Sequence, residues 1–289
     1  GLLLLGSLHP AHSRTRVASG DPDTTRSQPV VTAARLSGAA IHLDGRLRES
    51  AWQRTSGTTR FTQQEPVEGG TPSATTRVQV LYDDTALYIG ATLQYEDPDN
   101  VVARKLRRDA GLGSDDRLMW ILDTYDDGRT AYFFEINPAG LRGDGLLSTG
   151  QGTNLNKSWD GIWDVETHRT AFGWTAEIRI PFQSLQFDPQ RTAWGFNVQR
   201  TIRRKNEEIL WAGYPRDEGL FRPRFAGTLR GLTGLSQGLG LEVTPFGLTT
   251  ANRAWTDGGA STNTSVDAGG EISYALTPTL RSALTVNTD

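Results

Sequence analysis

Four side chains with hydrogen-bonding atoms stand at alternate positions of two strand-like stretches, Glu135 and Asn137 on one, Asn197 and Gln199 on the other. The large apolar residues of both stretches alternate with them, so we expect the four polar side chains on the face turned away from the core. Amides and carboxylates together supply donors and acceptors, which suits a ligand rich in hydroxyl groups. If the two stretches are neighbouring strands, the four side chains converge on one patch.

An apolar wall for this patch is expected from one of two aromatic residues in later segments. Trp211 ends a short apolar stretch, and Phe221 opens the loop Phe221-Arg-Pro-Arg-Phe-Ala-Gly. A flat ring beside polar groups can bind the apolar face of a hydroxylated ring. The alternative is that the four polar residues are ordinary solvent-facing strand residues, and the sequence leaves both interpretations open.

Paired carboxylates are the second kind of chemistry that the residues offer. Hydrolysis of a glycosidic bond needs two carboxyl groups on either side of it. Asp115 and Asp116 are adjacent, so on a strand they point to opposite faces. Asp160 and Asp164 lie in a loop rich in tryptophan and glycine. With no Gly-x-Ser-x-Gly motif and no histidine pair at metal spacing, we expect a binding domain rather than an enzyme.

A calcium site is one interpretation of the acidic turn Glu96-Asp97-Pro98-Asp99. Carboxylate oxygens are the ligands that calcium prefers. The spacing lacks the alternation of an EF-hand loop, and a solvated acidic turn is the other interpretation.

A hairpin between Ser114 and Gly140 lies at the centre of the predicted fold. Its first arm, Leu118–Leu122, is apolar on both faces, which indicates a strand covered on two sides. Asp126-Asp127-Gly128 supplies the turn, and Pro138 ends the second arm because it has no amide hydrogen.

Composition supports an all-β protein large enough for a full core. The chain has 289 residues, with 32 glycines, 8 tryptophans and 36% hydrophobic residues. The net charge of −3 gives no reason to expect a nucleic-acid partner. The absence of cysteine excludes disulfides and thiol chemistry, and it fits an exported bacterial protein.

Changes in composition divide the chain into four segments. Residues 1–13 are typical of the end of a signal peptide, with a leucine run followed by Ala11-His12-Ser13. Residues 14–33 are predicted to be a linker, and residues 34–232 carry the alternating strands of a β-sandwich. Within the sandwich, Leu47–Trp52 is expected to form a short helical turn over one end of the core. The fourth segment is 239–289.

Several motifs in a fixed order give the sandwich segment a family resemblance. It resembles the family 9 carbohydrate-binding modules, and in particular those of outer-membrane proteins that carry such a module ahead of a β-barrel. The resemblance implies a sandwich that binds sugars, with calcium in some members. The motifs are Asp44-Gly45, Ala51-Trp52, Val80–Gly90, Ser114-Asp-Asp, Asn137-Pro-Ala-Gly140, Gly173–Pro181 and Trp194–Gln199.

The resemblance also implies where a sugar binds. In sugar-binding members two tryptophans enclose the sugar ring and polar groups on nearby strands bind its hydroxyls. The polar positions correspond to Asn137 and Gln199, and Glu135 stands where an arginine is expected. The first tryptophan has no counterpart in residues 111–113, and the second falls near Phe221.

Residues 239–289 alternate with period two in segments long enough to cross an outer membrane. Leu239, Leu241, Val243, Ile272, Tyr274 and Leu276 form the expected outward face. The pattern also fits a soluble meander, and the resemblance favours the opening strands of a truncated outer-membrane barrel.

The sequence therefore predicts a periplasmic sandwich that binds a mono- or oligosaccharide and is attached to an outer-membrane barrel, with a link to carbohydrate uptake or breakdown. One alternative is a plug or docking domain that binds no sugar. A second is a module associated with a glycoside hydrolase.

Overall fold

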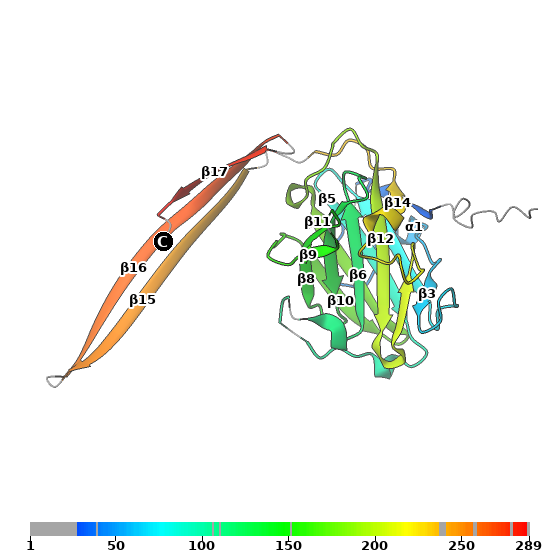
Figure 1. Cartoon of the computed structure of the whole chain (residues 1–289), viewed down its shortest axis with the longest axis horizontal. Helices are drawn as coiled ribbons and strands as arrows, with labels where there is room; N and C mark the ends of the chain where they lie inside the picture. Colours follow the sequence, from blue (N-terminus) through cyan, green and yellow to red (C-terminus); the bar gives the residue numbers. More distant parts are fainter. Residues whose placement is uncertain are drawn as a thin grey trace, which may run out of the picture.

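The computed structural model describes residues 28–38, 40–105, 107–109, 111–150, 152–236, 241–256, 259–277 and 280–287. Two β-sheets pack face to face and form a sandwich, and a separate sheet of three strands follows it in the chain (Figure 1). The expectation of an all-β protein with a β-sandwich is confirmed. The predicted signal segment 1–13 lies outside the described residues.

The larger sheet contains nine strands and carries the central hairpin in its middle. Its neighbours are antiparallel except for the pair formed by β1 and β14. The order is β1 (Val30–Thr32), β14 (Gly227–Arg230), β12 (Ala193–Ile202), β6 (Arg117–Asp123), β7 (Thr130–Ile136), β8 (Arg142–Ser148) and β9 (Asn154–Asn156), with β13 (Glu207–Leu210) paired to β12 and β3 (Thr62–Glu65) paired to β13.

The smaller sheet contains five strands and covers the inner face of the larger one. The connections between the two layers contain single turns of 3-10 helix, η1 (Pro98–Asn100) and η2 (Leu112–Ser114) between β5 and β6 and η3 (Phe182–Ser184) between β11 and β12, whereas η4 (Arg203–Lys205) and η5 (Pro223–Phe225) lie between strands of the larger sheet. The strand order is β10 (Asp164–Thr170), β11 (Gly173–Pro181), β5 (Ala86–Gln94), β4 (Thr76–Tyr82) and β2 (Ala34–Arg35).

The predicted central hairpin is confirmed as β6 and β7. Trp120 of β6 is 1% exposed and stacks on Phe134 of β7, with 5.3 Å between the ring centroids. Trp163 meets both rings edge-on. Asp126 and Gly128 adopt positive φ in the turn, as the sequence predicts. The inner faces of both sheets meet around this aromatic cluster.

The predicted helical turn is present as helix α1 (Ser50–Arg54), but it covers the outer face of the smaller sheet and not, as was expected, one end of the core. Trp52 donates a 2.8 Å hydrogen bond from Nε1 to the buried Glu177 of β11. The other oxygen of Glu177 accepts the amides of Asp44 and Gly45, each at 2.9 Å. A Cβ on Gly45 would come within 2.7 Å of the Thr167 backbone, so only glycine fits there. These contacts explain why the Asp-Gly and Ala-Trp motifs lie so close together.

One boundary of the predicted domains is wrong. Residues 30–32 were expected in the linker 14–33, but they form β1 and pair with β14. Val31 is 5% exposed and belongs to the core. Valine favours a strand, and burial of its apolar side chain stabilises the fold. The sandwich therefore begins before residue 34.

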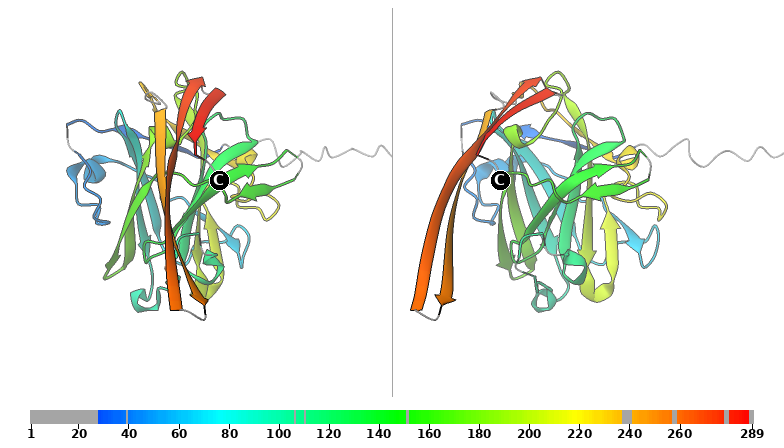
Figure 2. Two further views of the ribbon diagram at one scale, coloured as in Figure 1. Left: turned by 90° about the vertical axis from the view of Figure 1, so that its left-hand side faces the viewer. Right: turned by 60° about the vertical axis from the view of Figure 1, so that its left-hand side comes forward.

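The C-terminal strands form an open antiparallel meander of β15 (Leu241–Thr256), β16 (Gly259–Thr277) and β17 (Leu280–Val286). Both views of Figure 2 show long, curved strands in β15 and β16. Val243, Ile272 and Leu284 are cross-strand partners and are 49–65% exposed, so they share one apolar face. Leu239 lies outside the described residues. The expected barrel stays a prediction.

Among the residues that the structure describes, no helix has the length and hydropathy that a membrane span requires.

Candidate functional site

The candidate site is a groove of about 300 Å³ on the outer face of the larger sheet. Strands β6, β12 and β13 form its floor. The segment from Gly213 to Ala226 folds over the sheet and forms one wall. Its lining residues are Gln64, Arg117, Thr153, Gln199, Glu208, Arg216, Glu218, Gly219, Leu220, Phe221 and Arg222.

Phe221 forms the aromatic part of the groove. It stacks on Phe133 of β7, with 5.6 Å between ring centroids and 27° between ring planes. Gly219, two residues earlier, has φ = +88°, a conformation that other residues rarely adopt. Its amide donates a 2.8 Å hydrogen bond to the Gly213 carbonyl, which closes the loop. The ring is therefore held by stacking below and by a closed loop behind it.

A chain of charged and amide side chains crosses the floor. Arg117 lies 3.8 Å from the Glu135 carboxylate and 3.9 Å from that of Glu208. Gln199 donates a 3.0 Å hydrogen bond from Nε2 to Glu208. Lys157 forms the second ion pair of Glu135. Strand register explains the alignment, because Gln199, Met119 and Glu135 are successive cross-strand partners in β12, β6 and β7.

The rim of the groove carries arginines in two different states. Arg216 pairs with Glu65 through two hydrogen bonds, at 2.7 Å and 2.9 Å, the fork geometry that holds a guanidinium firmly. Arg222 is exposed, and no described acidic residue forms an ion pair with it. A ligand in the groove would therefore meet one fixed and one unpaired guanidinium.

Of the six residues predicted for the site, Gln199 and Phe221 line this groove. Glu135 lies on the same face, but it is 2% exposed and its carboxylate is ion-paired with Arg117 and Lys157. Glu135 would therefore support the residues that contact a ligand and would not contact the ligand itself. The condition that the two polar strands are neighbours is not met, because β6 lies between β7 and β12.

Asn137 does not face a ligand, contrary to the prediction. It is 0% exposed. Its Nδ2 donates to the Lys105 carbonyl at 2.8 Å and to Asp115 at 3.0 Å. Its Oδ1 accepts the amides of Ala139 at 3.1 Å and Leu141 at 2.9 Å. The side chain uses its full hydrogen-bonding capacity on the protein, so it fixes the turn after β7.

Asn197 is also a structural residue, which corrects the second prediction. It is 0% exposed and binds both backbone groups of Ala212, each at 3.0 Å. Trp211 points to the opposite side of the sheet from the groove. Its ring packs against Phe196 in the core, and Nε1 donates to Thr58 at 2.9 Å. Both residues attach the chain after β13 to β12.

Arg117, Glu208 and Gln64 also line the groove and were not predicted from the sequence. Arg117 shares the parity of Met119 and Ile121, so alternation alone places it on the outer face. No sequence pattern shows that β13 and the following loop cover that face. The Gln64 amide donates to the carbonyls of Tyr214 and Pro215, at 3.0 Å and 2.9 Å, and so attaches β3 to the loop.

The paired carboxylates of the hydrolase alternative do not flank a common space. Asp115 accepts the amides of Arg104 and Lys105, whereas Asp116 accepts those of Val102 and Arg203. Burial would raise the pKa of Asp115, but the hydrogen bonds it accepts hold that pKa below its ordinary value. Burial prevails at Asp116, whose pKa is raised.

The second pair is exposed and bound to arginines. The Asp160 side chain is 69% exposed and pairs with Arg108, and the Asp164 side chain is 58% exposed and pairs with Arg142 and Arg179. Neither environment resembles that of a carboxyl kept protonated for acid catalysis.

The acidic side chains of the turn Glu96-Asp97-Pro98-Asp99 do not form a cluster of calcium ligands. Glu96 pairs with Lys205 at 2.6 Å, and Asp97 accepts a hydrogen bond from Asn100. Among the residues that the structure describes, no three acidic or histidine side chains gather as metal ligands.

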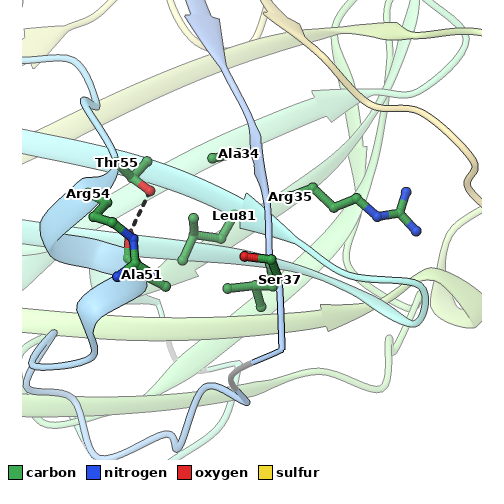
Figure 3. Close-up of a pocket in the computed structure, with 8 residues that line it drawn as sticks. Ala34, Arg35, Ser37, Ala51, Arg54, Thr55 and Leu81 are labelled. Carbon is green, nitrogen blue, oxygen red and sulfur yellow. Dashed lines mark hydrogen bonds between the residues drawn. The ribbon is translucent and has the colours of Figure 1, made fainter.

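A smaller hollow of about 100 Å³ lies between α1 and β2. Figure 3 shows Arg35 extending away from α1. Its guanidinium pairs with Asp84. Thr55 is bound to the Ala51 carbonyl at 2.8 Å. With about 100 Å³ and two of its polar side chains already bound, this hollow offers less to a ligand than the groove does.

The fold and the groove define a β-sandwich binding domain. The chain belongs to the family described as carbohydrate family 9 binding domain-like, whose model matches residues 43–208.

Solved structures show the same fold. A family 9 carbohydrate-binding module from Caldicellulosiruptor kristjanssonii, in complex with cellotriose, has a TM-score of 0.52 and 17% identity, over 72% of this chain and 95% of that one. Its glucose complex has a TM-score of 0.51 and 16% identity, over 72% and 96%. A Bacteroides uniformis protein has a TM-score of 0.54 and 11% identity, over 73% and 100%. A search of curated proteins found no match.

Proposed function

We propose that the sandwich is a carbohydrate-binding module and that the groove beside Phe221 binds a mono- or oligosaccharide. One observation carries the proposal. An aromatic ring fixed by Phe133 stands in the same groove as Gln199, Glu208 and Arg117. A pyranose ring presents an apolar face of C–H groups and a rim of hydroxyls, and such a groove complements both.

The free hydrogen-bonding atoms of the groove support a neutral ligand. Gln199 uses its Nε2 on Glu208, and its Oε1 accepts no hydrogen bond from a described residue. The same holds for Oε1 of Gln64, whose Nε2 is bound to the loop. Arg117 still has donors for a ligand, because its pairs with Glu135 and Glu208 are long. Acceptors and donors thus alternate along the floor, as the hydroxyls of a sugar require.

Family membership and the neighbouring structures support the same proposal. The neighbours bind cellotriose and glucose. In this chain Phe221 supplies one aromatic wall, so the ligand leans on one ring and depends more on the polar floor. We therefore expect modest affinity and a strong dependence on Gln199.

Calorimetric titration of the 289-residue chain with a panel of monosaccharides and oligosaccharides, glucose and cellotriose included, tests the proposal. If the chain is kept in detergent, that detergent must have no sugar head group, because such a head group would itself be a sugar ligand. Phe221→Ala is expected to weaken binding by about 0.5–1.5 kcal/mol, the value of an aromatic contact beyond its area. Phe172→Ala, at a ring that is 44% exposed and outside the groove, is the matched control. Saturable binding of an oligosaccharide that is insensitive to Phe221 would move the site elsewhere. If no sugar of the panel binds, the sandwich is a plug or docking domain.

We further propose that β15–β17 belong to an outer-membrane barrel and that the sandwich is exported to the periplasm. The support is the alternation of the two faces. Val243, Ile272 and Leu284 share an exposed apolar face, whereas Glu271 and Thr285 share the other. A sheet that meets lipid on one side and water on the other shows this alternation. A sugar-binding sandwich beside a barrel would serve carbohydrate uptake or breakdown.

A further inference from the structure

We infer that the sandwich has a second binding pocket, separate from the groove, which accepts one neutral monosaccharide ring. It lies at the end of the sandwich where β12 turns into β13, and its volume is about 180 Å³. Pockets for drug-sized ligands start at about 300 Å³, so this one has room for a single ring rather than a chain. Its lining residues are Ser73, Ala74, Tyr95, Glu96, Asp97, Asn100, Ile202, Arg204 and Lys205.

The pocket has an apolar floor whose aromatic ring is held in place. Ile202 is 3% exposed, and Tyr95 is half-buried beside it. The guanidinium of Arg200 lies over the Tyr95 ring, 4.5 Å from its centroid. Arg200 is itself fully buried and bound to the carbonyl of Thr75 at 3.1 Å and to the hydroxyl of Thr76 at 2.8 Å. A ring fixed in this way loses little freedom when a ligand packs against it.

The rim of the pocket is charged but balanced. Lys205 pairs with Glu96 at 2.6 Å. Asn100 links Arg204 to Asp97 by accepting a hydrogen bond from the first and donating one to the second. Two acidic and two basic side chains cancel, so nothing in the rim selects a charged ligand. Their remaining donors and acceptors can bind vicinal hydroxyls while Tyr95 covers the apolar face of the ring.

The pocket and the groove use different parts of one hairpin. Gln199 and Glu208 contribute to the groove from the middle of the paired strands, whereas Ile202 contributes to the pocket from the end of β12, and Arg204 and Lys205 from the turn. The two cavities share no lining residue. Occupation of one is therefore testable without the other, and failure of the groove proposal would leave this inference standing.

The test is an amide chemical-shift titration of the isotopically labelled 289-residue chain with glucose, galactose, mannose, xylose and N-acetylglucosamine. We expect at least one of these sugars to shift the amides of Ala74, Glu96 and Lys205 saturably. Ala74→Leu fills the pocket and should weaken this binding by about tenfold or more, which corresponds to about 1.4 kcal/mol. Ala139→Leu, at an exposed site, is the matched control.

Two further variants keep the inference falsifiable. Phe221→Ala should leave the pocket shifts unchanged, because Phe221 lies in the groove. If Ala74→Leu does not fold, Lys205→Ala removes one rim donor without touching the core and should weaken binding. Absence of pocket shifts with every sugar would overturn the inference. Shifts that survive both Ala74→Leu and Lys205→Ala, or that disappear only with Phe221→Ala, would overturn it as well.

Discussion

Asn137 donates a 3.0 Å hydrogen bond to Asp115, and this contact joins two motifs that lie on either side of the central hairpin. Asp115 also accepts the amides of Arg104 and Lys105, at 2.8 Å and 2.9 Å. Three segments are thereby fixed at one end of β6 and β7. The contact explains the Ser-Asp-Asp and Asn-Pro-Ala-Gly motifs as parts of the scaffold that supports the groove.

Asn137→Ala should lower the free energy of unfolding substantially. Each buried polar group left without a partner costs about 1–3 kcal/mol, and this side chain satisfies four. Urea denaturation followed by tryptophan fluorescence measures the loss. Asn154→Ala, at an exposed position of the edge strand β9, is the control. Equal stability of the two variants would show that the turn does not depend on Asn137.

Asp115 should make the fold sensitive to acid. Its pKa in the folded protein lies below the ordinary value of 3.8, so its charged form adds stability at higher pH. That contribution is lost as the pH falls through the lowered pKa. The unfolding free energy of the wild type should therefore fall more steeply below about pH 3.8 than that of Asp115→Asn. Parallel curves for the two proteins would contradict this assignment.

Trp120→Ala should cost about 3–5 kcal/mol, the range for deletion of a buried aromatic side chain. The ring is 1% exposed and contacts Phe134 and Trp163. Ile162→Ala, at a side chain that is 61% exposed, should change stability little. A loss below about 1 kcal/mol for Trp120→Ala would place that ring outside the core.

Val266→Lys should weaken association with lipid if the apolar face of the meander contacts a bilayer. A lysine on a lipid face costs about 2–4 kcal/mol at mid-membrane depth. Val266 is 72% exposed, and its neighbour Ser265 points to the opposite face, so Ser265→Lys is the matched control. Flotation with phospholipid vesicles compares the two. Equal binding by both variants would count against the membrane proposal.

Alternation along the chain was sufficient to predict the central hairpin and the sandwich. Leu118, Trp120 and Leu122 lie on one face of β6 and Met119 and Ile121 on the other, as their spacing requires. The two-sided apolar character of this arm also indicated that something covers its outer face. The sequence did not show that the loop around Phe221 is part of that cover.

The site was predicted less well, because alternation gives the face of a strand but not its neighbours or its exposure. Asn137 and Asn197 were expected to contact a ligand, yet both side chains are hydrogen-bonded to backbone groups of nearby turns. Gln199 reaches the groove because Glu208 of β13 lies beside it. Arg117 enters the site through the register of β6 with β12, a long-range pairing that local sequence does not encode.

The most direct measurement of the central claim is a nuclear Overhauser experiment between a bound oligosaccharide and the chain labelled at its phenylalanine rings. Cellotriose, present in a complex of a structurally similar module, is the first ligand to use. The account predicts contacts from sugar ring protons to Phe221 that disappear in Gln199→Ala and persist in Gln190→Ala, an exposed control. Saturable binding with no contact to Phe221, or contacts that Gln199→Ala leaves unchanged, would contradict it.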